Sequence, residues 1–154
     1  MYGKDERRAV KKEFWTNFGF VMKPHLSSEG RRVKWVNYPT GSKVLRFNMD
    51  ADQKQCMVSI DIRHHDPDIR EIYWEQLLET RAYLSGLSDM EWTWEEDHEL
   101  RSGEALHRVS ARLEDVNIFQ QEDWPRMYEF LKMGIRTLDE YWNDMRHLFD
   151  PLKD

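Results

Sequence analysis

The sequence predicts an α+β fold: a five-stranded, largely antiparallel sheet with helices packed mainly on one face, in the order α-β-β-β-α-β-β-α. The first observation is a strict alternation of apolar and polar residues over positions 45–63, the period of a strand with one buried face. The second is a similar alternation over 92–113. The third is the recurrence of apolar residues at three- and four-residue steps over 5–22, 66–86 and 123–149, which indicates amphipathic helices.

The length and composition favour a single α+β domain over residues 1–154 that is confined to the cytoplasm. With 34% charged and 13% aromatic residues, the chain has the composition of a globular protein rather than a disordered one. The formal net charge of −6 disfavours indiscriminate binding to nucleic acid or to anionic membranes, and no apolar run approaches the length that spans a bilayer. The first residues lack an apolar signal core, and the lone Cys56 fits a reducing compartment.

The N-terminal segment predicts a helix followed by a strand. Val10, Phe14, Phe18 and Val21 recur at helical spacing, and the first turns of this helix carry several Lys and Arg residues. These basic residues form either a solvated face or a contact surface. Pro24 ends the helix, and residues 33–38 then predict a strand that leads into the central hairpin.

The central hairpin predicts one buried and one polar face. Its apolar positions are Leu45, Phe47, Met49, Cys56, Val58, Ile60 and Ile62. Between them lie Arg46, Asn48, Asp50, Met57, Ser59, Asp61 and Arg63. A period of two places each set on one side of the sheet. The first set therefore predicts the core, and the second predicts a face that points away from the helices.

The second half of the chain repeats this combination of helix and hairpin. Asp66 and Pro67 predict the start of a helix, as N-cap and first helical residue, and Gly86 predicts its end. Residues 91–114 predict a second hairpin, in which Arg108, Ser110 and Arg112 share the polar face. A long helix over 123–149 would cover the apolar face, and Gly134 in its middle marks either close packing or a slight bend.

Several stretches together resemble a known protein family: KKEFW, VNYPTGSKVLRFNMD, the HDPDI helix entry, EWTWE and FQQEDWP. The chain is similar, over nearly its whole length, to a bacterial family of small proteins of unknown function. This domain is also found at the C-terminal end of proteins with a restriction-endonuclease-like domain. The resemblance implies a bacterial, cytoplasmic protein with one domain. It implies no catalytic residues, because the family has no established activity.

Asp50, Asp61 and Arg63 form the sharpest candidate for a catalytic site. Restriction-type nucleases place an acidic residue on one strand and an acidic-x-lysine tripeptide on the next, where two carboxylates hold Mg²⁺. Here the first elements have a similar order, and Asp50 and Asp61 share the polar face. Arg63 departs from the pattern, because an arginine stays protonated where the lysine would act. The alternative is that these residues belong to a solvated face with cross-strand ion pairs.

Four arginines on the same face form a candidate binding surface: Arg46, Arg63, Arg108 and Arg112. The guanidinium fork suits carboxylates and phosphates, so this face could meet a protein, an acidic ligand or a nucleic-acid backbone. The alternative is that these arginines pair with Asp61, Glu91 and Glu95 on a wet sheet face.

Other residues give weaker signals. His64, His65, Asp66 and Asp68 are adjacent at a strand end, where their side chains diverge, and helix capping explains Asp66 better than a metal site does. Cys56 falls on the apolar face, as expected of a buried small hydrophobe. Trp15 and Trp74 lie beside the helical stripes and are candidates for a self-association patch or for the edge of the core.

The sequence therefore favours a non-enzymatic interaction module that binds a protein partner or itself, with no cofactor, no metal and no membrane contact. The alternative function is a nucleic-acid-processing accessory with a degenerate nuclease-like core at Asp50, Asp61 and Arg63.

Overall fold

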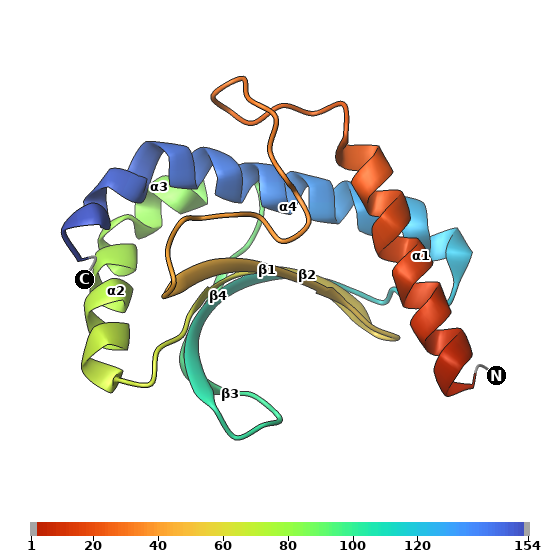
Figure 1. Cartoon of the computed structure of the whole chain (residues 1–154), viewed down its shortest axis with the longest axis horizontal. Helices are drawn as coiled ribbons and strands as arrows, with labels where there is room; N and C mark the ends of the chain where they lie inside the picture. Colours follow the sequence, from red (N-terminus) through yellow and green to blue (C-terminus); the bar gives the residue numbers. More distant parts are fainter. Residues whose placement is uncertain (1–2, 153–154) are drawn as a thin grey trace.

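The computed structural model describes residues 3–152 and has an α+β fold, in which a curved sheet lies beneath a long helix (Figure 1). The strands are β1 (Leu45–Ala51), β2 (Gln55–Ile62), β3 (Thr93–Glu99) and β4 (Ala105–Glu114). All pairs are antiparallel, in the order β1-β2-β4-β3. The helices are α1 (Lys4–Met22), α2 (Pro67–Glu79), α3 (Arg81–Gly86) and α4 (Trp124–Met145), with 3₁₀ turns at Gln121–Asp123, Arg146–Leu148 and Asp150–Leu152.

The prediction of a fifth strand is wrong. The sheet has four strands in the described part of the chain, and residues 33–38 belong to an ordered loop between α1 and β1. Side chains rather than a ladder hold this loop. The indole N–H of Trp35 donates to the carbonyl of His25 at 3.0 Å, and the Tyr38 hydroxyl donates to the buried Asp139 carboxylate on α4 at 2.5 Å. Asn37 between them has φ of 60°, which interrupts an extended chain.

Both predicted hairpins are confirmed, with the register that the alternation requires. Phe47 lies opposite Ile60 in the β1–β2 pair, and Ile60 lies opposite Val109 in the β2–β4 pair. These three side chains are buried on the convex side of the sheet, beneath α4. The polar residues of the same strands consequently face the concave side.

The predicted helix over 66–86 is two helices, α2 and α3, with a break at Thr80. Asp66 caps α2 as predicted, since its carboxylate accepts from the N–H of Asp68 at 2.9 Å. At the break, the buried Thr80 hydroxyl contacts the carbonyl of Leu77 at 2.9 Å and the hydroxyl of Tyr141 on α4 at 2.6 Å. This contact with α4 fixes the direction change that the periodicity alone does not reveal.

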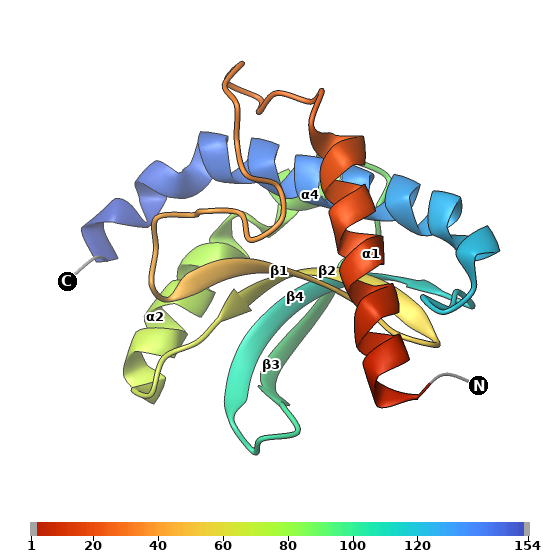
Figure 2. The same ribbon diagram turned by 45° about the vertical axis from the view of Figure 1, so that its right-hand side comes forward.

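The C-terminal helix covers the sheet as predicted, although α4 ends at Met145 and a 3₁₀ turn follows at Arg146–Leu148. Gly134 marks close packing: a Cβ there would lie 2.4 Å from Cγ1 of Val58 on β2. α1 crosses α4 near the 51–55 turn between β1 and β2, and the 23–44 loop leads from the end of α1 back to β1 (Figures 1 and 2). Phe14 and Phe18 of α1 join the same core as α4.

Candidate functional site

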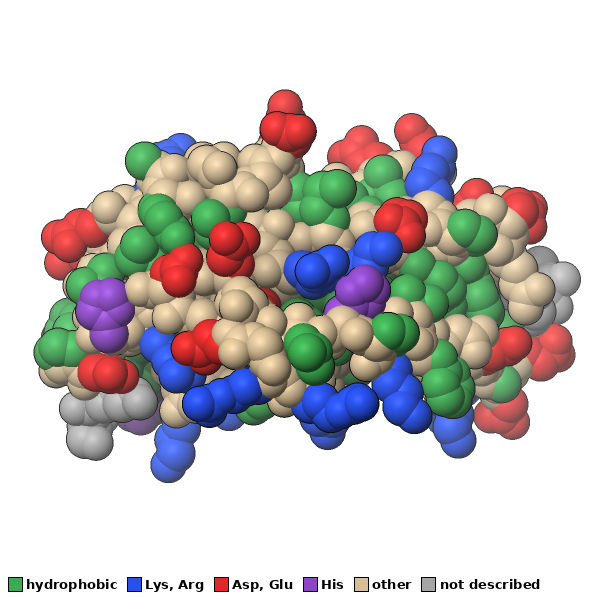
Figure 3. Space-filling view, turned by 90° about the horizontal axis from the view of Figure 1, so that it is seen from above, with side chains coloured by type: hydrophobic (Ala, Val, Ile, Leu, Met, Phe, Trp, Pro, Cys, Tyr) green, Lys and Arg blue, Asp and Glu red, His purple; other side chains and the backbone are tan. Residues whose placement is uncertain are grey.

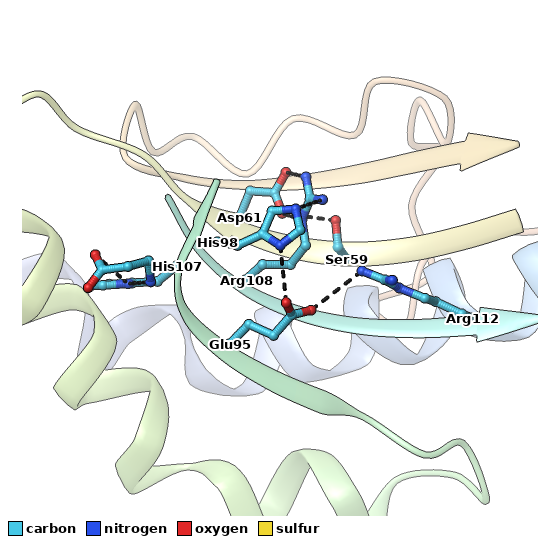
Figure 4. A network of polar contacts seen from close by, with 8 residues as sticks. Ser59, Asp61, Glu95, His98, His107, Arg108 and Arg112 are labelled. Atoms are coloured by element: carbon cyan, nitrogen blue, oxygen red, sulfur yellow. Dashed lines mark hydrogen bonds and ion pairs between the residues drawn. The ribbon is translucent and has the colours of Figure 1, made fainter. Parts of the chain in front are cut away.

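The concave face of the sheet carries the polar residues that the sequence singles out. One row crosses all four strands, because the register places these residues side by side: Arg46, Asp61, Arg108 and Glu95. The strand order brings Asp61 of β2 next to Arg108 of β4, which are 47 residues apart in the chain. Figure 4 shows Asp61, Arg108 and Glu95 of this row close together on the sheet.

Asp61 and Arg108 form a buried, two-pronged ion pair. Nε of Arg108 donates to one carboxylate oxygen at 2.8 Å, and Nη2 donates to the other at 3.0 Å. Both side chains are under one-tenth exposed. Burial opposes the charge on Arg108, but the hydrogen bonds and the negative charge of Asp61 outweigh it, so the pKa of Arg108 is raised. Because both carboxylate oxygens of Asp61 bond to Arg108, we assign Asp61 a structural role.

His98 covers this pair, and a β-bulge puts it there. The register of β3 against β4 shifts between Glu95 and His98, and Asp97 takes a left-handed conformation with φ of 52°. Nε2 of His98 lies 3.3 Å from Nη1 of Arg108. A guanidinium nitrogen can only donate a hydrogen bond. Nε2 therefore accepts, and Nδ1 carries the proton that is donated to Glu95 at 3.1 Å. Sequence parity does not predict this residue, since the bulge reverses the alternation.

The remaining polar groups extend the network at both ends. The hydroxyl of Ser59 donates to Asp61 at 3.0 Å, and Arg112 donates to Glu95 at 3.4 Å. Ser110 is fully buried, and its hydroxyl finds no partner within residues 3–152. Apart from that hydroxyl, the network satisfies itself, which is the arrangement that keeps a buried polar cluster stable.

The structure does not bring the three residues of the nuclease-like pattern together. Asp50 lies opposite Met57, four residues along β2 from Asp61, or about 13 Å at a rise of about 3.3 Å per residue. Arg63 instead donates to Glu104, in the loop that joins β3 to β4, at 2.5 Å. The hydrogen bond and charge of Arg63 lower the pKa of Glu104. The two aspartates are thus too far apart to share one metal ion.

The four arginines predicted to bind a ligand have different environments. Arg108 is buried on Asp61, Arg63 pairs with Glu104, and Arg112 pairs with Glu95. Arg46 is exposed at the β1 edge and makes no ion pair within the described part of the chain. Of the set, Arg46 is the one whose charge is available to a ligand.

The structure also shows the environments of the other residues that the sequence singled out. Cys56 is fully buried, and this burial raises the pKa of its thiol to about 12. The rings of His64 and His65 stack on each other at 4.3 Å, and no group of three or more potential metal ligands occurs among residues 3–152. Trp15 is half-buried, whereas Trp74 is buried between Trp94 and His107 and so is not available for self-association.

The strongest surface feature is a separation of charge that neither the total charge nor the alternation reveals. Residues 1–49 hold eleven Lys or Arg and four Asp or Glu, a net charge of +7, and the remaining residues have a net charge of −13. Five basic residues and no acidic one lie between Gly30 and Met49: Arg31, Arg32, Lys34, Lys43 and Arg46. All five are exposed. Lys and Arg side chains line one long edge of the molecule in Figure 3. We call these five residues, with Lys11 and Lys12 of α1, the basic surface.

A comparison with known protein families identifies the family of this chain. A family model described as "Domain of unknown function (DUF4268)" matches residues 10–146. The chain belongs to this family. No curated protein and no solved structure matches it. The match confirms the resemblance to a family of unknown function and assigns no activity. None of the helices within residues 3–152 is long and apolar enough to cross a bilayer.

Proposed function

We propose that this domain is a non-enzymatic module that binds an acidic surface of a protein partner through the basic surface. The observation that carries the proposal is the charge separation, +7 in residues 1–49 against −13 in the rest of a chain whose total charge is −6. An acidic chain gains nothing in solubility from such a cluster of like charges, which repel one another. A negatively charged partner relieves that repulsion and is steered to this edge of the molecule.

The state of the polar network supports a binding role over a catalytic one. Both carboxylate oxygens of Asp61 accept from Arg108, and Asp50 stands about 13 Å away along the hairpin. A general acid or base, or a metal ligand, must reach the reacting centre, whereas Asp61 is buried and its charge is already neutralised by Arg108. The bacterial and cytoplasmic setting that the resemblance implies belongs to the same proposal, and a buried free thiol at Cys56 is consistent with it.

Site-specific photo-crosslinking in a lysate of the source organism tests the proposal. A photoreactive amino acid replaces Asn48, which is exposed beside Arg46, or Glu79, which is exposed on α2 and serves as the control position. We expect a protein adduct from position 48 and none from position 79. The adduct should be lost in Arg32→Glu/Lys34→Glu, because both basic side chains are exposed and reversal repels an acidic partner.

The matched control for charge reversal is Arg101→Glu/Arg136→Glu, which changes the same number of exposed basic residues elsewhere. It should leave the adduct intact. Equal labelling from positions 48 and 79 would contradict the proposal. An adduct that nuclease treatment removes would instead assign the basic surface to nucleic acid.

A further inference from the structure

A small slot opens at the edge of β1, next in sequence to Lys34 and Arg46 of the basic surface. It has a volume of about 190 Å³ and lies between α1 and the loop that precedes β1. Its walls combine aromatic and aliphatic residues with two asparagines at the slot: Trp15, Trp35, Tyr38, Phe47, Val36, Met49, Ile135, Asn37 and Asn48. An apolar cavity of about 150 Å³ is large enough for a benzene ring, so this slot can take one large apolar side chain.

The main chain of β1 is unpaired where it borders the slot. The N–H of Arg63 donates to the carbonyl of Val44, and the N–H of Asp52 donates to the carbonyl of Gln55, both at 2.9 Å. Ladder bonds in an antiparallel pair fall on alternate residues, so even-numbered residues of β1 bond to β2 and odd-numbered ones point outward. The outward groups of Leu45 are taken by the Ser42 and Thr40 hydroxyls, at 3.0 and 2.7 Å.

No such partner exists for Phe47 and Met49. Their outward N–H and C=O groups have no hydrogen-bond partner within residues 3–152. Phe47 is 8% exposed as a whole residue and Met49 is partly exposed, so an edge strand with unused main-chain donors and acceptors remains here. An unpaired strand edge beside a pocket is the geometry that accepts an added extended peptide, with main-chain bonds for affinity and the pocket for one side chain.

The positive charge around the slot determines which peptide sequence would bind best. Arg46 flanks the unpaired stretch on β1, and Lys34 precedes Trp35 in the slot wall. Lys11 lies one helical turn before Trp15 on α1. Asp50 is the single acidic residue on β1. An extended segment laid along this edge therefore passes through a positive field, which favours acidic residues on either side of the apolar one.

A second copy of the chain fits this edge less well than another protein does. The acidic strand of the domain is β3, the opposite edge of the sheet. Its pairing is already broken by the bulge at Asp97, which protects an edge against strand addition. Contact of β1 with β3 of another copy would also be head-to-tail, so it would build a ring or an open filament rather than a symmetric dimer.

We propose that β1 binds an extended, acidic segment of the partner protein as an added strand, with one large apolar side chain of that segment in the slot. The segment exchanges main-chain hydrogen bonds with Phe47 and Met49, and its acidic residues face Arg46, Lys34 and Lys11. This inference rests on the proposed function, which it deepens by specifying how the partner binds.

A displayed library of short random linear peptides, selected against the full chain, tests the inference. We expect enriched peptides to carry an aromatic or large aliphatic residue flanked by Asp or Glu. The best of them, fluorescently labelled, should bind the protein in an anisotropy titration and weaken as salt is raised. Enrichment of peptides without this pattern, or no enrichment, would overturn the inference.

Met49 offers a matched pair of variants for the main-chain bonds. Met49→Pro removes an outward N–H and no ladder bond, a substitution that edge strands tolerate, whereas Met49→Leu keeps the N–H at similar volume. The proline variant should bind the selected peptide about tenfold or more weakly, from the loss of one or two main-chain bonds, and the leucine variant should bind normally. Equal binding by the two variants would overturn strand addition.

Val36→Trp tests the slot without altering β1, in case the proline variant unfolds. An indole there fills the slot, and the labelled peptide should lose binding by a similar factor. A partner adduct from position 48 that persists in both Met49→Pro and Val36→Trp would overturn strand addition while the proposed function stands. Displacement of the peptide by a single-stranded oligonucleotide, or a dimer in light scattering that Met49→Pro abolishes, would assign the edge to another occupant and overturn the inference.

Discussion

Replacing Gly134 with alanine is expected to destabilise the protein, although the same change stabilises an ordinary helix. Gly134 is buried in α4 where this helix rests on β2. A Cβ at this position would lie 2.4 Å from Cγ1 and 3.1 Å from Cβ of Val58, and 3.4 Å from the terminal methyl of Met90. The first contact is shorter than a carbon–carbon contact can be, so α4 or β2 must move.

The magnitude follows from two opposing effects. Alanine is favoured over glycine in a helix interior by about 1 kcal/mol. Overpacking a core costs about 1–3 kcal/mol, and here the upper part of that range applies. Val58 is fully buried on a strand paired on both sides, and its branched side chain has little rotamer freedom. We expect a net loss of about 1–2 kcal/mol, which lowers the Tm of a chain of this size by about 2–8 °C.

Urea unfolding followed by circular dichroism measures the effect. The matched control is Gly19→Ala in α1, where a Cβ meets no other atom within 4 Å, and this variant should gain up to about 1 kcal/mol. In a Val58→Ala background, Gly134→Ala should become neutral or stabilising, because the clashing methyl group is gone. If Gly134→Ala and Gly19→Ala stabilise the wild-type protein equally, the close approach of α4 to β2 is refuted.

Three further predictions concern the polar face and buried ionisable groups. Asp61→Ala leaves Arg108 buried without its partner. It should cost about 3 kcal/mol in urea unfolding, whereas Glu104→Ala at an exposed pair should cost under about 1 kcal/mol; equal losses would contradict the burial of the first pair. Millimolar Mg²⁺ should leave the Tm unchanged beyond the effect of NaCl at matched ionic strength, and a Mg²⁺-specific rise that Asp61→Asn abolishes would restore the nuclease-like alternative. Burial raises the pKa values of Cys56 and Tyr128 from 9.0 and 10.0 to about 12, so the folded state favours their protonated forms. Their contribution to stability is complete below pH 9.0 and is lost as the pH rises towards about 12. The urea concentration at the midpoint of unfolding should therefore decrease between pH 9.0 and about 12, and a constant midpoint would refute this reasoning.

The sequence by itself determined the two hairpins, the two faces of the sheet and the helices. This information is local, because a strand's alternation or a helix cap such as Asp66 with Pro67 depends on residues a few positions apart. The same alternation placed Asp61 and Arg108 on the polar face. It did not make them partners, since that depends on the insertion of β4 beside β2 in the strand order.

Tertiary contacts decided the rest. Residues 33–38 have the composition of a strand, but Asp139, 101 positions after Tyr38, holds them in a loop, and no local pattern encodes that choice. The bulge at Asp97 turned His98 onto the polar face against the alternation. The slot exists only because α1, the loop and the free edge of β1 meet there. Alternation fixes which way a side chain points, whereas its neighbour across space depends on how distant segments pack.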